Sequence, residues 1–447
     1  CCSENGLSGA EATALVPLLC SCGSIFDVFG SRPAHKPAEL VTFQSKASLR
    51  MLWQGNVGSA EKNVFFPAKS GNVIYAVSAT GAVTGFNAAN GAVMARIEAG
   101  QRVSGGVGAG GGVVLRGTAR GEVLAFERDG KSLWKAQLSG EVLAPPESQD
   151  GTVVARTGDG RIHGLDVASG KPKWEYQRTT PALSVRTHAG LVIERGAVFV
   201  GFPGGRLVGI SLANGNVGWE AVVALPRGAT ELERVADITS LPVIDGLRIC
   251  AVAFQGRVAC FDNTRGTLIW ARDVSSIAGL GVDERNVYVT DDKSAVLGLD
   301  KSGGASLWRQ DKLAWRNVSA PLGIGRYVAV GDFEGYVHLL SREDGSFAAR
   351  IATDGSAINA PPVALDSTSF LVQTRNGGVF AITIQAQDLN SATLLTRSEQ
   401  YDKAEEMLQQ LIQKEPANSK YYFFLGENYL LDYFADTISN SLTVAAK

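Results

Sequence analysis

The stretch GEVLAFERDGKSLW, residues 121–134, holds the pattern that decides the fold. It contains a Gly-led strand of alternating apolar residues, a turn with a second Gly, and Trp four residues after that Gly. Copies of the strand begin at Gly81, Gly121, Gly160, Gly205, Gly256, Ser294, Gly335 and Gly377, so successive copies start 38 to 51 residues apart. This spacing is typical of one propeller blade. Eight copies within residues 41–385 predict an all-β, eight-bladed β-propeller with four-stranded antiparallel blades.

Six of the seven Trp residues occupy one position of the repeat. They are Trp53, Trp134, Trp174, Trp219, Trp270 and Trp308, while Ala95 and Ala349 fill the two copies without Trp. A large flat side chain fills the wedge between twisted sheets, so these positions predict packing between neighbouring blades. Stacking on a cofactor is the alternative, but a role repeated around a whole ring favours packing.

The two ends of the repeat region complement each other. Trp53 precedes the first complete hairpin, whereas no Trp-type strand follows the last hairpin near Phe370 to Ile384. The N-terminal strand is therefore predicted to complete the last blade, which protects the sheet edges.

Composition and motifs exclude several function classes. The 42 basic and 44 acidic side chains give a net charge of -2, without the basic excess expected of a nucleic-acid-binding protein. The run from Gly106 to Gly111 has dinucleotide-binding spacing, but a strand and no helix follows it, so it is interpreted as a turn. The four His residues make no metal-ligand spacing. We therefore expect no catalytic residues, no metal and no cofactor.

The N-terminal region has features of a lipoprotein signal. The apolar run ATALVPLL at residues 12–19 leads into Leu19-Cys20-Ser21-Cys22, although no Met and no basic residue precede Cys22. Residues 1–22 are interpreted as a remnant signal peptide with a lipidation site at Cys22, and an unmodified Cys is the alternative. Residues 23–40 are interpreted as a tether.

Two further sequence features lie after the tether. Cys250 and Cys260 flank a turn within one blade, so a cross-strand disulfide suits an oxidising compartment, while two buried free thiols suit the sequence equally. Residues 386–447 change to a helical period, with Pro416 between two apolar helices. This tail resembles a tetratricopeptide helix pair.

The strand followed by G-x-x-x-W resembles the quinoprotein-like eight-bladed propellers. Within them, the strings LSVRTHAG from Leu183, ELERVADITSLPVIDG from Glu231 and VGDFEGYVHLLSREDG from Val330 are similar to the BamB family, lipoproteins of the outer-membrane β-barrel assembly complex. The resemblance covers roughly residues 19–385. It implies a non-enzymatic scaffold, lipid-anchored to the outer membrane and facing the periplasm. It also implies binding to the POTRA domains of BamA and to other subunits of the complex, with the propeller monomeric within it.

The resemblance also implies a BamA-binding surface. The family's L-x-L-R loop maps onto Leu183, Val185 and Arg186, with Val in place of the second Leu. Its acidic D-x-D loop maps onto Asp237, with Thr239 in place of the second acid. These segments lie in the two longest repeats, and extra loop length on a ring is where binding functions are usually added.

Two alternative functions fit the same blades. A pyrroloquinoline-quinone-dependent dehydrogenase, as the resemblance to quinoproteins implies, needs a catalytic Asp, calcium ligands and usually a vicinal disulfide. The only adjacent cysteines, Cys1 and Cys2, lie outside the propeller. A cell-envelope glycan-binding propeller would gather aromatic residues on one loop face, and Trp315, the one Trp outside the repeat, is the only indication of this.

Overall fold

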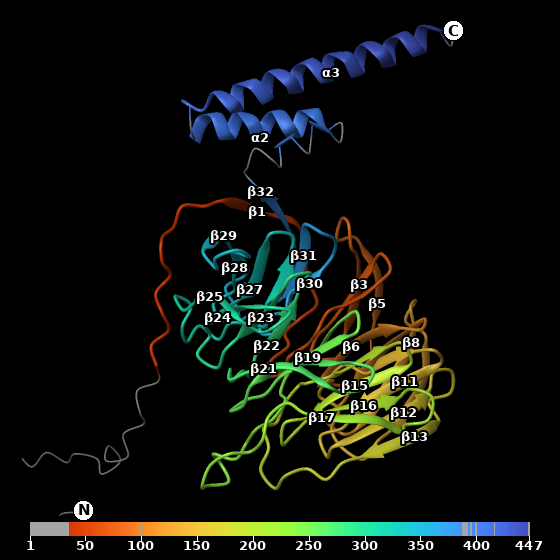
Figure 1. Cartoon of the computed structure of the whole chain (residues 1–447). Helices are drawn as coiled ribbons and strands as arrows, with labels where there is room; N and C mark the ends of the chain where they lie inside the picture. The colour runs from red at the N-terminus through yellow and green to blue at the C-terminus, as the bar shows by residue number, and fades with distance from the viewer. Residues whose placement is uncertain are drawn as a thin grey trace, which may run out of the picture. The chain divides into compact units, whose positions relative to one another are not determined.

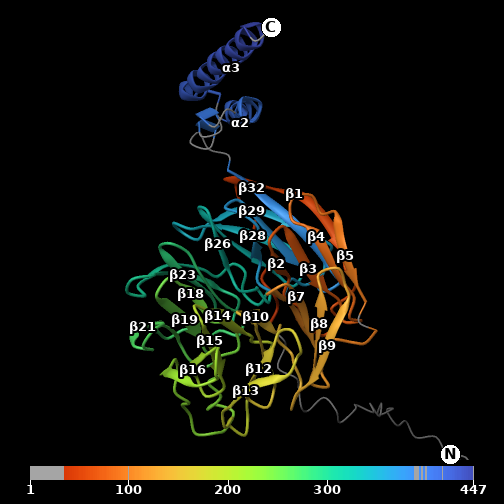
Figure 2. The same cartoon turned by 90° about the vertical axis from the view of Figure 1, so that its right-hand side faces the viewer.

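The predicted eight-bladed propeller is confirmed. The computed structural model describes residues 35–98, 100–386, 392–393, 396–397, 400–414 and 416–445, and the compact unit described below begins at Pro37. Eight antiparallel sheets of four strands each follow one another along the chain (Figures 1 and 2). We number the blades 1 to 8 in chain order.

Each of blades 1 to 7 is built from four consecutive strands, which run from the inner to the outer edge. Blades 1 to 4 contain β2 (Ala68–Ser70), β3 (Val73–Val77), β4 (Val83–Asn87) and β5 (Val93–Ile97); β6 (Gly105–Gly110), β7 (Val113–Gly117), β8 (Glu122–Glu127) and β9 (Ser132–Gln137); β10 (Glu147–Gln149), β11 (Thr152–Arg156), β12 (Arg161–Asp166) and β13 (Pro172–Gln177); and β14 (Leu191–Glu194), β15 (Ala197–Phe202), β16 (Arg206–Ser211) and β17 (Val217–Val222).

The remaining blades repeat this order, except that blade 8 takes its outer strand from the start of the chain. Blades 5 to 8 contain β18 (Val243–Asp245), β19 (Arg248–Val252), β20 (Val258–Asp262) and β21 (Leu268–Arg272); β22 (Gly279–Val282), β23 (Asn286–Thr290), β24 (Val296–Asp300) and β25 (Ser306–Gln310); β26 (Leu322–Ile324), β27 (Tyr327–Gly331), β28 (Tyr336–Ser341) and β29 (Phe347–Ala352); and β30 (Val363–Ala364), β31 (Ser369–Gln373), β32 (Gly378–Ala386) and β1 (Ala47–Asn56).

The ring closes as predicted, by pairing of the first and last strands. β1 runs antiparallel to β32, with Ala47 opposite Ala386 and Asn56 opposite Gly378. The two strands lie side by side in both views, although one begins and the other ends the propeller (Figures 1 and 2). Because β1 covers the edge of β32, blade 8 has the same four strands as the other blades.

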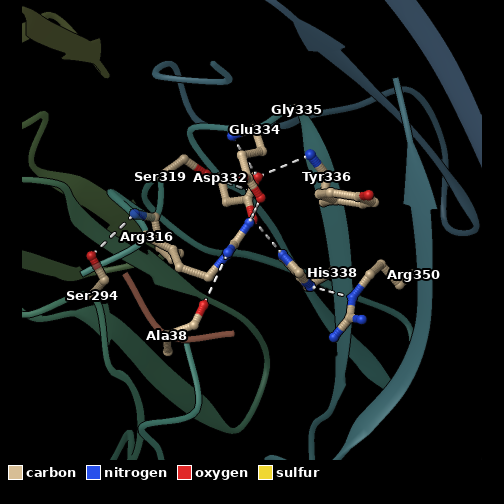
Figure 3. A network of polar contacts seen from close by, with 12 residues as sticks. Ala38, Ser294, Arg316, Ser319, Asp332, Glu334, Gly335, Tyr336, His338 and Arg350 are labelled. Atoms are coloured by element: carbon tan, nitrogen blue, oxygen red, sulfur yellow. Dashed lines mark hydrogen bonds and ion pairs between the residues drawn. The ribbon is translucent and has the colours of Figure 1, made fainter. Parts of the chain in front are cut away.

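Residues 38–46, which precede β1, contact the last blades through two buried or partly buried arginines. Arg316 Nη1 donates to the carbonyl oxygen of Ala38 at 3.0 Å. Arg350 Nη1 donates to the carbonyl oxygen of Val41 at 3.2 Å. Figure 3 shows both arginines within one polar network. The chain is therefore fixed to the propeller before β1 begins.

The repeated Trp residues pack between blades, as predicted. Each indole Nε1 donates to a backbone carbonyl of the next blade at 2.8 to 2.9 Å: Trp53 to Ala88, Trp134 to Val167, Trp174 to Leu212, Trp219 to Asn263, Trp270 to Lys301 and Trp308 to Arg342. Each ring also lies against a glycine in the outer turn of that blade. A Cβ added at these glycines would lie 2.4 to 2.7 Å from the ring, at Gly91, Gly170, Gly215, Gly266, Gly304 and Gly345. The repeated Gly and Trp thus form one contact between neighbouring blades.

The two copies without Trp have local explanations. The outer strands of blade 8, β32 and β1, are not joined by a turn, so Ala349 of blade 7 has no turn glycine to pack on and lies in a core cluster with Ala47. In blade 2, a Cβ added at Gly130 would lie 3.2 Å from the carbonyl oxygen of Arg96. The backbone of β5 therefore approaches the turn that an indole covers elsewhere.

The prediction that the glycine run at residues 106–111 forms a turn is wrong for most of the run. Residues 105–110 form the inner strand β6, and only the last glycine lies in the turn before β7. A Cβ added at Gly108 would lie 1.7 Å from the carbonyl oxygen of Pro146, and one at Gly110 would lie 2.6 Å from that of Ser148. The glycines therefore allow the inner strands of blades 2 and 3 to approach closely.

The C-terminal tail is helical, as predicted, and contains α2 (Tyr401–Lys414) and α3 (Ser419–Ala445). Ala404, Leu408 and Leu411 of α2 are buried. Asn428 Nδ2 of α3 donates to the carbonyl oxygen of Tyr401 at 3.0 Å, so the two helices pack together. Among the described residues, no helix combines the length and the apolar character needed to cross a membrane.

Candidate functional site

The predicted site lies on one face of the propeller. Because neighbouring strands are antiparallel, all connections between blades emerge on the same face as the turns between second and third strands. We call this the connection face. Residues 178–190 connect blade 3 to blade 4, and residues 223–242 connect blade 4 to blade 5. The structure therefore places the two predicted segments in adjacent connections.

Asp237 holds these two connections together. Its Oδ2 accepts a hydrogen bond from the backbone N–H of Val185 at 2.7 Å, and its Oδ1 accepts one from the N–H of Gly204 at 3.0 Å. Only 2% of Asp237 is exposed. Because both carboxylate oxygens are occupied inside the chain, Asp237 fixes the position of the loop at residues 183–187, which we call the 183–187 loop.

Thr239 makes the second link between the connections. Its carbonyl oxygen accepts a hydrogen bond from Thr187 Oγ1 at 2.6 Å, and its own hydroxyl donates to the carbonyl oxygen of Ile277 at 3.2 Å. Thr239 is also buried. The hydroxyl thus extends the contact to the connection between blades 5 and 6, and three successive connections become one unit.

Arg186 is exposed and paired with a residue that the sequence did not indicate. Its Nε and Nη2 donate to the two carboxylate oxygens of Glu141 at 2.9 and 2.7 Å. The hydrogen bonds from Arg186 lower the pKa of Glu141, although partial burial opposes this. The Arg186 side chain is 59% exposed. A pair this open to water contributes little stability, but its two-point geometry holds the guanidinium in one orientation.

The five predicted residues thus lie close together with different roles. Leu183 and Arg186 are exposed and available to a partner. Val185, Asp237 and Thr239 make internal contacts that position the loop. Exposed apolar side chains also occur on the other connections of this face, at Leu225, Leu232 and Ile277.

Three residues of this region were missed by sequence reasoning. Glu141 and Thr187 carry no repeat signal, because each is defined by a partner distant in the chain. Arg156 could have been found, because it is the last residue of β11, where the second strands of the other blades end in uncharged residues. It lines a hollow beside Val185 and Arg186.

The cysteine predictions fall on different parts of the chain. Cys22 lies outside the described residues. Cys250 of β19 and Cys260 of β20 are directly opposite each other, with Cα atoms 4.1 Å apart, and their sulfurs form a disulfide. Both are buried. The disulfide therefore joins the two central strands of blade 5.

Three further features of the structure concern the binding of ligands. Among the described residues, no group of three or more His, Cys, Asp or Glu is arranged to hold a metal ion. Trp315, the one Trp outside the repeat, is partly buried, and its backbone N–H donates to the carbonyl oxygen of Lys293 at 2.8 Å. A hollow of about 420 Å³ on the connection face is bordered by Val185 and Arg186 of the 183–187 loop.

Sequence comparisons point to one family. The family model described as "Outer membrane protein assembly factor BamB" matches residues 79–310. The outer membrane protein assembly factor BamB of Nitrosomonas eutropha is 43% identical to this chain over 367 residues, which cover 81% of this chain and 90% of that protein. The match therefore extends over nearly all of the relative.

Comparison with solved structures gives the same family and a wider fold class. The crystal structure of BamB from Moraxella catarrhalis superposes with a TM-score of 0.69 at 27% identity, covering 75% of this chain and 99% of that one. A quinohemoprotein alcohol dehydrogenase from Pseudomonas putida HK5 superposes with a TM-score of 0.62 at 13% identity, covering 75% and 76%. The likeness to the dehydrogenase shows a shared propeller fold and nothing more.

Proposed function

The chain belongs to the family of the outer membrane protein assembly factor BamB, and from this membership we propose that it is a scaffold of the β-barrel assembly complex and not an enzyme. Its partner in this proposal is BamA, bound through the POTRA domains, and the propeller acts as a single copy within the complex. The dehydrogenase alternative has only a likeness of fold at 13% identity in its favour.

The observation that carries this proposal is the construction of the 183–187 loop. Leu183 and Arg186 are exposed, while Asp237 and Thr239 fix the loop between them from the neighbouring connection. A loop held in one conformation loses little conformational entropy when it binds, so more of the contact energy appears as affinity. Arg is also one of the residue types that are enriched at the centres of protein interfaces, so a rigidly held Arg186 suits a docking surface.

The position of the chain in the cell envelope forms part of the proposal. Lipidation at Cys22 would anchor the chain to the outer membrane on its periplasmic side, as the family resemblance implies. The contact between Ala38 and Arg316 fixes residue 38 to the propeller, which supports a short connection between the lipid anchor and the propeller. The tether available to the anchor is then residues 23–37.

Capture of BamA from a membrane extract tests the function. Arg186→Glu and Leu183→Asp should each reduce the amount of BamA that co-purifies by at least about tenfold, because each changes an exposed anchor of a docking surface. Arg265→Glu is the matched control, since Arg265 is also exposed but lies in the outer turn of blade 5, on the opposite face.

Three outcomes would contradict the proposal. Unchanged BamA capture by both loop variants, with their thermal midpoints unchanged, would remove the 183–187 loop from the interface. Reduction of a redox dye after addition of pyrroloquinoline quinone and calcium would favour the dehydrogenase. Sedimentation with purified peptidoglycan would favour the glycan-binding alternative.

A further inference from the structure

A hollow of about 240 Å³ lies between blades 3 and 4, next to the 183–187 loop. The residues that line it include Arg156, Thr180, Ser184 and Pro203, together with the paired Glu141 and Arg186. The volume is below the range of about 300–1,000 Å³ that is usual for small-molecule sites. A single side chain or chain end of another protein fits this space better than a free metabolite.

Arg156 is the charged group of this hollow, and it is held in place by neutral contacts. Its Nη1 donates to the carbonyl oxygen of Ala189 at 3.1 Å, and its guanidinium lies 5.5 Å from the centre of the Phe202 ring. No carboxylate of the described residues forms an ion pair with it within 4.0 Å. Its Nε and Nη2 make no hydrogen bond with the described residues and are not fully buried, so they are accessible from the hollow.

The nearby acids are already occupied by other groups. Glu141 uses both carboxylate oxygens for Arg186, and Asp237 uses both for backbone N–H groups. Burial lowers the pKa of Arg156 to about 10, with Asp237 opposing this shift, so the guanidinium keeps its charge at neutral pH. A partly buried cation with unused donors favours an anion that brings its own negative charge.

The propeller repeat shows that the fold does not require this arginine. Arg156 ends the second strand of blade 3 opposite Ile162, and the residues in the same register of the other seven blades are Val77, Gly117, Gly201, Val252, Thr290, Gly331 and Gln373. None of these side chains is charged. A blade of this protein therefore forms equally well with an uncharged residue here, which separates Arg156 from the structural pattern of the repeat.

We propose that the hollow between blades 3 and 4 is a carboxylate-binding pocket, in which Arg156 binds one acidic group of the protein that docks on the 183–187 loop. This inference rests on the proposed function, in which the docking protein is BamA. A planar guanidinium pairs with a carboxylate through two parallel hydrogen bonds, so the pocket gives the docked partner a fixed register. The ligand is an Asp or Glu side chain or a chain-terminal carboxylate.

Carboxylate footprinting of the complex tests this pocket. The full chain and the soluble POTRA region of BamA are mixed at saturating concentration and treated with carbodiimide and glycine ethyl ester, and the modified acids are identified by mass spectrometry. One carboxylate of BamA should be protected in the complex with the wild-type chain and reactive in the complex with Arg156→Gln. Its position in BamA distinguishes a side chain from the chain end.

The binding affinity provides the second measurement. Arg156→Gln should weaken binding by about 30-fold or more, because it leaves a desolvated carboxylate without its partner. Its thermal midpoint should not change, since Gln373 occupies the equivalent position in blade 8. Arg156→Lys keeps the charge but not the two-point geometry, so it should bind with intermediate affinity. If Arg156→Gln fails to fold, the affinity of Arg156→Lys still tests the pocket.

The outcomes separate this inference from the proposed function. If Arg186→Glu and Leu183→Asp weaken binding but neither Arg156 variant does, and no carboxylate changes its protection, the pocket is overturned and the docking loop stands. If none of the four variants weakens binding, the proposed function itself fails.

Discussion

His338 Nε2 lies 3.0 Å from Asp332 Oδ2, and neither side chain has any exposed surface. Arg350 Nε donates to His338 Nδ1 at 3.1 Å, so Nδ1 accepts and the ring proton of the neutral imidazole lies on Nε2, where it is donated to Asp332 (Figure 3). Arg316 Nε also donates to Asp332, at 2.8 Å. A buried network with these exact roles depends on the protonation state of each member.

Stability should therefore fall when the pH is lowered from 7 to 5. Burial lowers the pKa of His338, and also those of His163 and His188. Below pH about 6.5 the unfolded chain binds protons at these residues that the folded chain does not, so the free energy of unfolding decreases, by up to about 1.4 kcal/mol per pH unit for each His. Urea unfolding at pH 7, 6 and 5 measures this decrease. A His338→Gln variant should show a smaller slope, and equal slopes would contradict the contribution of His338.

Asp332→Asn should destabilise the propeller by about 3–5 kcal/mol, because it removes the fully buried carboxylate that Arg316 and His338 share and leaves Arg316 only the half-exposed Glu334. Burial alone raises the pKa of Asp332, but hydrogen bonds from His338, from the backbone N–H of Tyr336 and from Arg316 lower it overall. The carboxylate thus contributes stability above pH about 4 that is lost as the pH falls through the lowered pKa. Asp245→Asn is the control, since Asp245 is 43% exposed and pairs with Lys301 near the surface, and it should change stability by less than about 1 kcal/mol. Similar losses for both variants would contradict this ranking.

Deletion of residues 41–57 should open the ring. It removes β1, so β32 becomes an unpaired edge, and the thermal midpoint should fall with a tendency to aggregate. Trp53→Ala tests the same contact with a single change and should cost about 3–5 kcal/mol, because the indole is buried against blade 1. Leu52→Ala on the same strand is the control, since Leu52 is 40% exposed. An unchanged midpoint in the deletion variant would disprove closure by β1.

Asp237→Ala should loosen the 183–187 loop without unfolding the propeller. It leaves the N–H groups of Val185 and Gly204 without their acceptor, at a cost of about 1–3 kcal/mol each. Hydrogen exchange measured by mass spectrometry should accelerate in peptides that cover residues 183–187. BamA capture should fall although Leu183 and Arg186 are intact, because the loop must then be ordered on binding. Unchanged exchange would show that other contacts hold the loop.

The disulfide between Cys250 and Cys260 should contribute about 2–3 kcal/mol, as expected for a bond that closes a sequence separation of 10 residues. A Cys250→Ala, Cys260→Ala double variant should lose this amount in urea unfolding. Reductant should have little effect on the native chain, because both sulfurs are buried, and should act only after unfolding. Rapid reduction in the absence of denaturant would contradict this expectation.

The sequence alone determined the number of blades, the closure of the propeller and the packing of the repeated Trp residues between blades. These features depend on local signals, namely the alternation of apolar residues, the turn glycines and a Trp at the same position in six of the eight copies, and each of these Trp residues forms the same contact with the next blade. The interpretation of residues 106–111 failed because the reason for their glycines, the approach of β6 to Pro146 of the next blade, is not local.

Only the tertiary structure decided what the residues of the candidate site do. The family resemblance assigns Asp237 to the partner-binding surface, but packing of two connections buries its carboxylate against the backbone N–H of Val185, 52 residues away in the chain. Arg186 likewise meets Glu141 across 45 residues, and Ala38 meets Arg316 across 278. These pairs form because the propeller brings together segments that are distant in the chain. A local sequence pattern does not indicate which distant segment will lie next to it.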